Sequence, residues 1–175
     1  MKTDILISGF GGQGLMLLGK IIAQAALQED KHVTWFPSYG AEMRGGTAHC
    51  YVKISDTAIA SPLVDYPDAA VILNQPSFDK FKKKIIKADL VILNTDLVRP
   101  LASSDKKRYV QVPLNSAALE CGDSKVSNSI VLGILISRKH LFQEQTAIAV
   151  LKETFPNQQI QEVNLKGFRY GQRIR

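Results

Sequence analysis

A glycine-rich segment between two apolar patterns constrains the fold more than any other stretch. It reads SGFGGQG from Ser8, after a short run of buried-type residues and before a helical pattern of apolar residues. Gly9, Gly11 and Gly14 fit the spacing G-x-G-x-x-G, which is typical of a strand, a phosphate-holding loop and a helix. The sequence therefore predicts that an α/β fold begins here.

The rest of the chain alternates between strand-like and helix-like segments. Strands are expected at residues 4–8, 32–36, 47–55, 68–74, 88–94 and 108–113. Helices are expected at residues 15–28, 78–86, 127–140 and 144–155, and from residue 157 onward. This alternation predicts an α/β fold, a three-layer α/β/α sandwich with a mostly parallel mixed sheet.

The first strand, helix and second strand form a Rossmann-like βαβ start. Such a unit has a right-handed crossover and parallel strands. The strand at 47–55 begins a hairpin-like insertion, with residues 57–62 (TAIASP) as its antiparallel partner. This insertion is what makes the predicted sheet mixed.

Composition limits the class of protein. The 175 residues are 45% hydrophobic and contain no linker rich in Gly, Ser or Pro, so a single domain over residues 1–175 is expected. We see no signal peptide and no apolar stretch that would span a membrane, and we expect a cytoplasmic protein. Cys50 and Cys121 are far apart, so no metal or iron–sulfur cluster is expected on this chain.

The chain has a formal net charge of +6, and one segment is strongly basic. This segment, residues 80–87, reads KFKKKIIK. We interpret it as a solvated helix face with Phe81, Ile85 and Ile86 turned inward, because aromatic interleaving is poor and no nucleic-acid-binding module is present. No nucleic-acid partner is expected.

The glycine loop suits an anion, although not the usual dinucleotide. Glycines let backbone N–H groups approach a phosphate, and the following helix directs its positive end at it. A NAD-binding unit also places an acidic residue about 20 residues later to hold the ribose. Here residues 34–38 read TWFPS, and the next acid is Glu42. An NAD-dependent dehydrogenase domain is therefore disfavoured, while a stand-alone acyl-carrier or nucleotide-binding module stays open.

A second polar loop follows the second strand and reads PSYGAEMRGG over residues 37–46. It should emerge at the same carboxyl edge of the sheet as the glycine loop. Arg44 is able to clamp a carboxylate or phosphate, or to pair with Glu42 or with another chain.

The three histidines are scattered along the chain, so no catalytic residue is predicted.

The two loops together resemble the gamma subunit of 2-oxoacid:ferredoxin oxidoreductases. ASPLVDYPDAAVILN at residues 60–74 and VSNSIVLG at residues 126–133 resemble further segments of that family. The second loop is more similar to the 2-oxoglutarate type, or to that of a related 2-oxoacid branch, than to the pyruvate type. The resemblance covers nearly the whole chain and is clearest over residues 5–80.

The resemblance implies a multi-subunit enzyme that oxidatively decarboxylates a 2-oxoacid, transfers the acyl group to coenzyme A and passes two electrons to ferredoxin. Thiamine diphosphate, Mg²⁺ and [4Fe-4S] clusters would belong to alpha and beta subunits or to a ferredoxin-like delta subunit. This chain would have no catalysis of its own and no cofactor of its own apart from coenzyme A. The resemblance leaves open whether the isolated chain forms a homodimer.

The resemblance also assigns site residues. The glycine loop would face coenzyme A or a partner subunit through Gly9, Phe10, Gly11, Gly12, Gln13 and Gly14. Lys20 would supply a phosphate-binding lysine, with a solvated lysine as the alternative. Three residues of the second loop, Tyr39, Glu42 and Arg44, would lie near the mouth of the active site. Asn128 would belong to the same site, with a packing role as the alternative.

Overall fold

A computed structural model describes residues 1–38, 47–99 and 108–174. The strands are β1 (Lys2–Gly9), β2 (His32–Ser38), β3 (Ala48–Ser55), β4 (Ala69–Ile72), β5 (Leu90–Asn94) and β6 (Tyr109–Val112). The α-helices are α1 (Leu15–Leu27), α2 (Gln75–Phe81), α3 (Leu114–Cys121), α4 (Ser127–Lys139), α5 (Glu144–Thr154) and α6 (Gln158–Arg173). Two 3₁₀ turns, η2 (Ile85–Lys87) and η3 (Ser124–Val126), lie between them.

The strands form one six-stranded sheet in the order β2-β3-β1-β4-β5-β6. In the half of the sheet formed by β1, β4, β5 and β6, neighbouring strands are parallel. Strand β3 is antiparallel to both β1 and β2. The prediction of a mostly parallel mixed sheet is confirmed. The first two strands run parallel, as predicted, because each is antiparallel to β3. They are not neighbours, since β3 returns from β2 as its antiparallel partner and lies between β2 and β1. Tyr51 of β3 accordingly lies opposite Leu6 on one side and Phe36 on the other.

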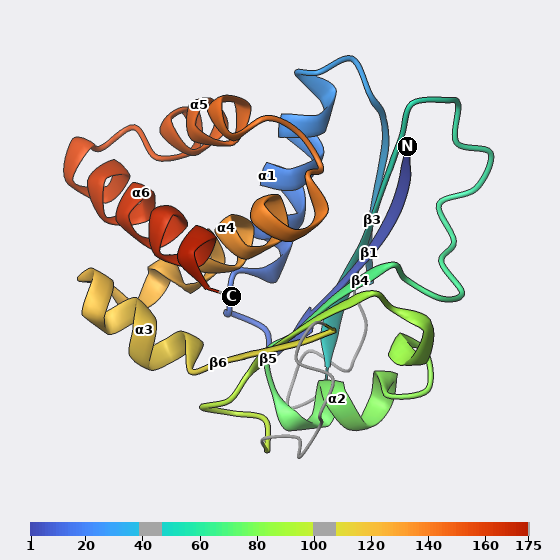
Figure 1. The fold of residues 1–175 in the computed structure, drawn as a ribbon, viewed down its shortest axis with the longest axis horizontal. Coiled ribbons are helices and arrows are strands. Elements are labelled where there is room, and N and C mark those ends of the chain that lie inside the picture. The colour runs from blue at the N-terminus through green and yellow to red at the C-terminus, as the bar shows by residue number, and fades with distance from the viewer. Residues whose placement is uncertain (39–46, 100–107, 175) are drawn as a thin grey trace.

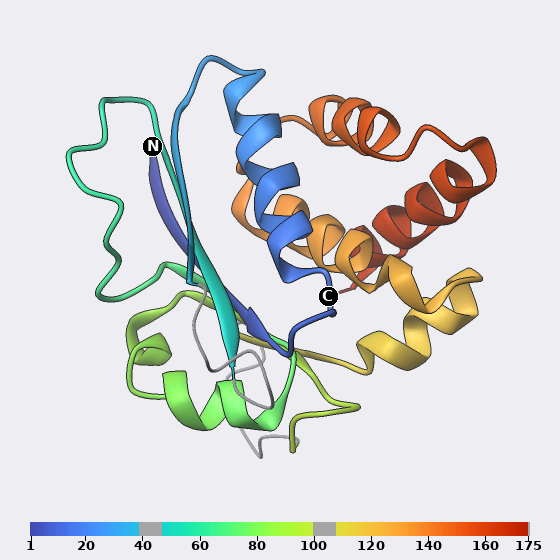
Figure 2. The same ribbon diagram turned by 180° about the vertical axis from the view of Figure 1, so that it is seen from behind.

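Helices cover the two faces of the sheet unequally (Figures 1 and 2). Alternate residues of β1 point to opposite faces, so Ile5 and Ile7 join one core cluster while Leu6 joins the other. The larger cluster packs under α1, α3, α4, α5 and α6, and the smaller one packs under α2 and η2. Burial on both faces explains why the central strands have continuous apolar sequences.

Residues 57–62 do not form the predicted antiparallel strand. Two lysines instead hold the segment after β3 through its backbone carbonyls. Lys53 Nζ donates to Leu63 O at 2.7 Å, and Lys84 Nζ donates to Val64 O at 2.9 Å. Lys53, itself buried, also pairs with Asp4 at 3.2 Å. Hydrogen bonds from long side chains thus replace the ladder of backbone hydrogen bonds that a strand would need.

The basic segment 80–87 is partly as predicted. Phe81 and Ile85 are buried, whereas Ile86 is 62% exposed, so its predicted inward orientation is wrong. The helix stops at Phe81 and resumes as the 3₁₀ turn η2, which changes the side of the chain that faces the core. The Arg108 guanidinium donates to the carbonyls of Ile85 and Ile86, each at 2.7 Å.

Helices α4 and α6 pack closely on one another. Gly133 of α4 and Gly171 of α6 lie against each other's helix, because an added Cβ would come within 2.1 Å of Phe168 O and 2.0 Å of Ile130 O, respectively. The predicted deep burial of α4 is confirmed. Helix α3 lay between two predicted elements and was not predicted. In the described parts of the chain, no helix is long and apolar enough to cross a membrane.

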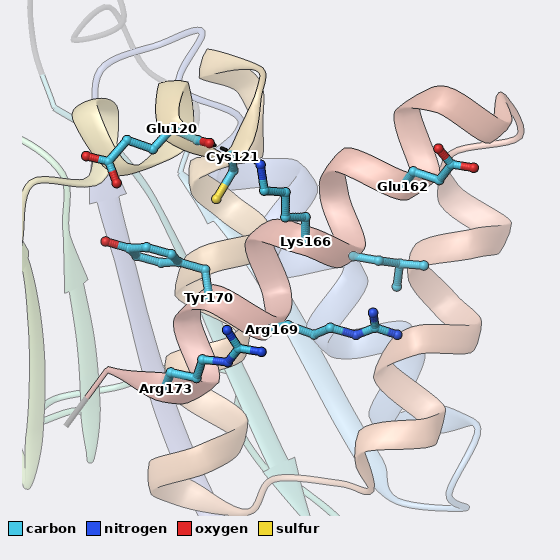
Figure 3. A pocket seen from close by; sticks show the side chains of 8 residues that line it. Glu120, Cys121, Glu162, Lys166, Arg169, Tyr170 and Arg173 are labelled. Carbon is cyan, nitrogen blue, oxygen red and sulfur yellow. Dashed lines mark hydrogen bonds between the residues drawn. The ribbon is translucent and has the colours of Figure 1, made fainter.

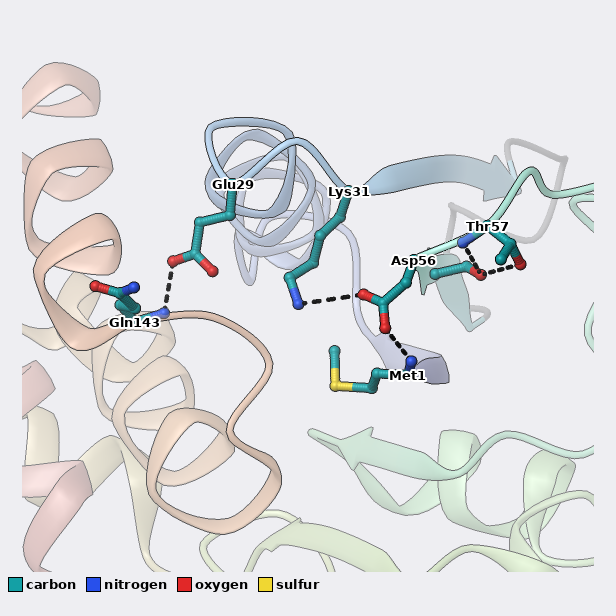
Figure 4. Close-up of polar contacts among 7 residues, drawn as sticks. Met1, Glu29, Lys31, Asp56, Thr57 and Gln143 are labelled. Atoms are coloured by element: carbon teal, nitrogen blue, oxygen red, sulfur yellow. Dashed lines mark hydrogen bonds and ion pairs between the residues drawn. The ribbon is translucent and has the colours of Figure 1, made fainter.

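The far end of α1 is tied to its surroundings by polar contacts (Figure 4). Glu29 Oε1 accepts hydrogen bonds from Gln143 N at 2.6 Å and from Thr146 Oγ1 at 2.7 Å, so it caps the start of α5. Lys31 Nζ lies 3.6 Å from Asp56 Oδ1, and the Met1 ammonium pairs with the same carboxylate. These contacts join α1, α5 and the end of β3.

Candidate functional site at the carboxyl edge of the sheet

The candidate site lies where β1, β4, β5 and β6 end, at the carboxyl edge of the sheet. The glycine loop follows β1, α2 follows β4, and α3 follows β6. Open α/β sheets bind ligands at this edge, because loops and helix N-termini from several strands meet there. The geometry at the edge therefore decides which backbone groups are available to a ligand.

The glycine loop is a compact turn closed by its own glutamine. Gln13 Oε1 accepts the Phe10 N–H at 2.6 Å, and Gln13 N donates to Phe10 O at 3.3 Å. Gly9 is buried and has no room for a side chain, since an added Cβ would lie 2.4 Å from Gln13 Oε1 and 2.9 Å from Leu73 Cβ. Gly11 and Gly12 are exposed at the tip, and Gly12 has a φ of +91°. Gln13 and Gly9 thus shape the loop, and the tip glycines face solvent.

Helix α1 begins with no side-chain cap, unlike its neighbours at this edge. Its N-cap is Gly14, with φ of +72°. In contrast, Asn74 Oδ1 accepts Ser77 N at 2.8 Å at the start of α2. At the start of α3, Asp96 Oδ2 accepts Asn115 N at 2.7 Å and Ser116 N at 2.9 Å. The uncapped donors and the positive end of α1 suit an anion beside the glycine loop.

Asn128 contacts the glycine loop from the start of α4. Its Nδ2 donates to Gln13 O at 3.1 Å, and an added Cβ at Gly14 would lie only 2.3 Å from that nitrogen. Asn128 Oδ1 is buried and has no hydrogen-bond partner. The structure therefore brings Asn128 together with the glycine loop, a contact that the sequence did not predict, and its role toward a partner or an active site stays a prediction.

Lys20 is exposed and lies away from the loop tip, over β2. Its Nζ is 5.2 Å from the centre of the Trp35 ring, a cation–π contact. Trp35 and Cys50 in turn pack against Gly19, where an added Cβ would lie 2.7 Å from Trp35 Nε1. The phosphate-binding role of Lys20 stays a prediction, and its contact with Trp35 had no sequence signal.

The two cysteines are buried and free. Burial raises the pKa of the Cys50 thiol to about 12. Burial also raises the pKa of Cys121. Both therefore stay protonated near neutral pH, which disfavours nucleophilic chemistry. Among residues 1–38, 47–99 and 108–174, no group of three or more His, Cys, Asp or Glu side chains is placed to hold a metal ion.

Comparison with known proteins places the chain in a family. Residues 4–174 match the family model described as pyruvate ferredoxin/flavodoxin oxidoreductase. The chain belongs to this family. It is 34% identical to the 2-oxoglutarate synthase subunit KorC of Methanocaldococcus jannaschii over 99% of this chain and 94% of that protein. It is also 38% identical to the ketoisovalerate oxidoreductase subunit VorA of Methanothermobacter marburgensis, over 78% of this chain. The match spans only 28% of VorA.

Solved structures of the oxidoreductase family agree with the fold. One is described as the gamma subunit of a keto/oxoacid ferredoxin oxidoreductase from Geobacter sulfurreducens, with a TM-score of 0.80, 29% identity and coverage of 97% of this chain and 95% of that one. The 2-oxoglutarate:ferredoxin oxidoreductase of Magnetococcus marinus has a TM-score of 0.87 at 22% identity, over 99% of this chain and 31% of that one. The resemblance to gamma subunits inferred from the loop motifs is confirmed.

Residues 39–46 of the second loop lie outside the described residues, and with them Tyr39, Glu42 and Arg44, whereas residues 37 and 38, predicted as loop, form the end of β2. The strands on either side of it are placed: Ser38 lies opposite His49, and Ala48 lies opposite Gly9. Both ends of the second loop therefore join the sheet at the edge that carries the glycine loop. The roles assigned to its three polar residues stay predictions.

Beneath the edge lies a polar network that the sequence analysis did not single out. Ser8 Oγ donates to Ser77 Oγ at 2.9 Å and lies 3.2 Å from Ala48 O. Asn94 Nδ2 donates to Leu73 O at 3.3 Å, and its Oδ1 accepts Leu114 N at 3.1 Å. These contacts tie the ends of the strands to α2 and α3. The asparagines that end both apolar runs, 68–74 and 88–94, were the available signal.

Proposed function

We propose that this chain is the gamma subunit of a 2-oxoacid:ferredoxin oxidoreductase acting on 2-oxoglutarate. The similarity to KorC over nearly the full length of both proteins carries the proposal. In the proposed complex, a 2-oxoacid is oxidatively decarboxylated, coenzyme A accepts the acyl group, and ferredoxin accepts two electrons. Alpha and beta subunits, with or without a ferredoxin-like delta subunit, hold thiamine diphosphate, Mg²⁺ and the [4Fe-4S] clusters.

We further propose that the glycine loop serves the coenzyme A side of this reaction. Coenzyme A supplies a pyrophosphate and a 3′-phosphate, and anions are favoured at an uncapped helix start. The open start of α1 and the exposed Gly11 and Gly12 support this placement. The Magnetococcus marinus enzyme, described with 2-oxoglutarate, coenzyme A and succinyl-CoA bound, gives independent support from a relative of the same fold. The chain binds and orients; it supplies no catalytic group.

The test is an activity assay of the assembled complex. The chain is co-expressed with its partner subunits without oxygen, and coenzyme A-dependent reduction of ferredoxin is measured with 2-oxoglutarate, pyruvate and branched 2-oxoacids. We expect the highest kcat/KM with 2-oxoglutarate. A complex that assembles and prefers another 2-oxoacid contradicts the substrate assignment. A chain that recruits no partner and supports no activity contradicts the subunit assignment.

A matched pair of variants tests the role of the loop. Gly11→Asp places a carboxylate at the exposed tip, and Gly11→Asn places a neutral side chain of the same size there. Repulsion between the carboxylate and a phosphate nearby should raise the KM for coenzyme A about fivefold to tenfold in the aspartate variant alone. Equal KM values in both variants and the wild type would remove the coenzyme A role and leave the subunit assignment intact.

A further inference from the structure

A pocket lies away from the glycine loop, between α3 and α6 (Figure 3). Its volume is about 500 Å³, within the range of small-molecule sites. Glu120 and Cys121 of α3 line one side, and Lys166, Arg169, Tyr170 and Arg173 of α6 line the other. None of these residues belongs to the loop discussed above, so this pocket is independent of the proposed function.

The α6 wall of this pocket is basic. Residues 166, 169, 170 and 173 recur at helical spacing and therefore share one face. Lys166 Nζ donates to Glu120 O at 3.1 Å and so joins the two helices. Within the described residues, neither Arg169 nor Arg173 forms a hydrogen bond or an ion pair, and both are exposed. Two guanidinium groups are thus available to a ligand.

The pocket also offers apolar and aromatic surface. The Tyr170 ring is half-buried and packs against the large core cluster, as Leu165 does, and both residues line the pocket. In Figure 3 the Cys121 thiol faces the space above Tyr170, while Arg173 lies beneath the ring. Glu162, the second carboxylate of the lining, lies at the end of α6 farther from Arg173. The arginine end is therefore the end that favours negative charge.

We propose that this pocket binds an organic phosphate of about nucleotide size. The planar forks of Arg169 and Arg173 match the geometry of phosphate oxygens, which guanidinium groups bind in pairs of hydrogen bonds. A phosphate alone is far smaller than the pocket. The ring or sugar that carries the phosphate lies against Tyr170 and Leu165, and the tyrosine ring provides a flat apolar face for it.

Calorimetric titration of the full chain with AMP, adenosine and inorganic phosphate tests this proposal. AMP should bind at least tenfold more tightly than adenosine, because adenosine lacks the charged group. The double variant Arg169→Ala/Arg173→Ala should weaken AMP binding at least tenfold. The matched control Arg99→Ala/Arg138→Ala removes two arginines outside the pocket and should change it less than twofold.

A third variant separates the two ends of the pocket. Tyr170→Leu keeps an apolar side chain but removes the ring, so it should weaken AMP severalfold and leave inorganic phosphate unchanged. Circular dichroism confirms that each variant is folded before titration. AMP binding that survives the double arginine variant contradicts the proposal, because AMP then binds elsewhere. Equal affinity for AMP and adenosine, or no binding of AMP to the wild type, also overturns it.

Discussion

The two ends of α1 differ in how their backbone and side-chain groups are satisfied. At its start, Gly14 offers no side chain, and the first-turn donors have no side-chain cap. At its far end, Glu29 caps α5 and Lys31 pairs with Asp56. A helix fixed at one end and chemically open at the other is a suitable support for a binding loop, since the fixed end holds the open one in position.

The largest expected effect is at the open end. Gly14→Ala introduces a Cβ at φ of +72°, 2.3 Å from Asn128 Nδ2, so the amide must move and lose its hydrogen bond to Gln13. We expect a loss of about 2 to 4 kcal/mol in the free energy of unfolding, measured by urea denaturation. Gly12→Ala is the matched control, because its φ is +91° but nothing lies within 4 Å of the added Cβ. That variant should lose only about 1 kcal/mol; equal losses would show that the Asn128 contact contributes nothing.

An intermediate effect is expected at the fixed end. Glu29→Ala removes two hydrogen bonds at the start of α5 and should lower the free energy of unfolding by about 1 to 2 kcal/mol. Glu29→Gln keeps an acceptor oxygen and should lose about half as much. Urea midpoints measure both. Because the loop is at the other end of α1, neither variant should change the KM for coenzyme A of the assembled complex, and a rise in that KM would mean that the two ends are coupled.

The smallest effect concerns Asp56 and pH. A hydrogen bond from the N-terminal ammonium, together with the charges of that group and of Lys31, lowers the pKa of the Asp56 carboxyl below its ordinary value of 3.8. The stabilisation is therefore present above the unfolded pKa and is lost as pH falls through the folded pKa. Asp56→Asn should lower the urea midpoint slightly near neutral pH, and the difference from the wild type should disappear in strong acid. A difference that persists there would exclude an ionic origin.

Most of the fold was predictable because its signals are local. Apolar runs predicted β1, β4 and β5, and helical spacing predicted α1, α4 and α5 within a few residues. The order of strands in the sheet was harder to predict, because the sequences of β1 and β2 would be the same whether or not β3 lay between them. Ile86 was misplaced because a change from α-helix to 3₁₀ turn shifts the buried face without changing the composition.

The site was predictable to a smaller extent. The spacing of the glycines located the loop, whereas the contact of Asn128 with Gln13 was not predicted, because it joins residues 115 positions apart. Which backbone N–H groups of the loop are already hydrogen-bonded within the protein depends on the direction of its side chains. The sequence did not indicate that Gln13 Oε1 would accept the Phe10 N–H. The cation–π contact of Lys20 likewise depends on Trp35, which lies in another element.

The hydrogen bond between Gln13 and the Phe10 amide has a consequence for affinity. Because the loop closes on its own side chain, its backbone entropy is lost when the chain folds and not when a ligand arrives. A ligand at the tip therefore meets a surface that is already ordered, and its binding free energy is not reduced by the work of shaping the loop. Replacing Gln13 would transfer that ordering to the binding step, so the same contacts would give a weaker complex.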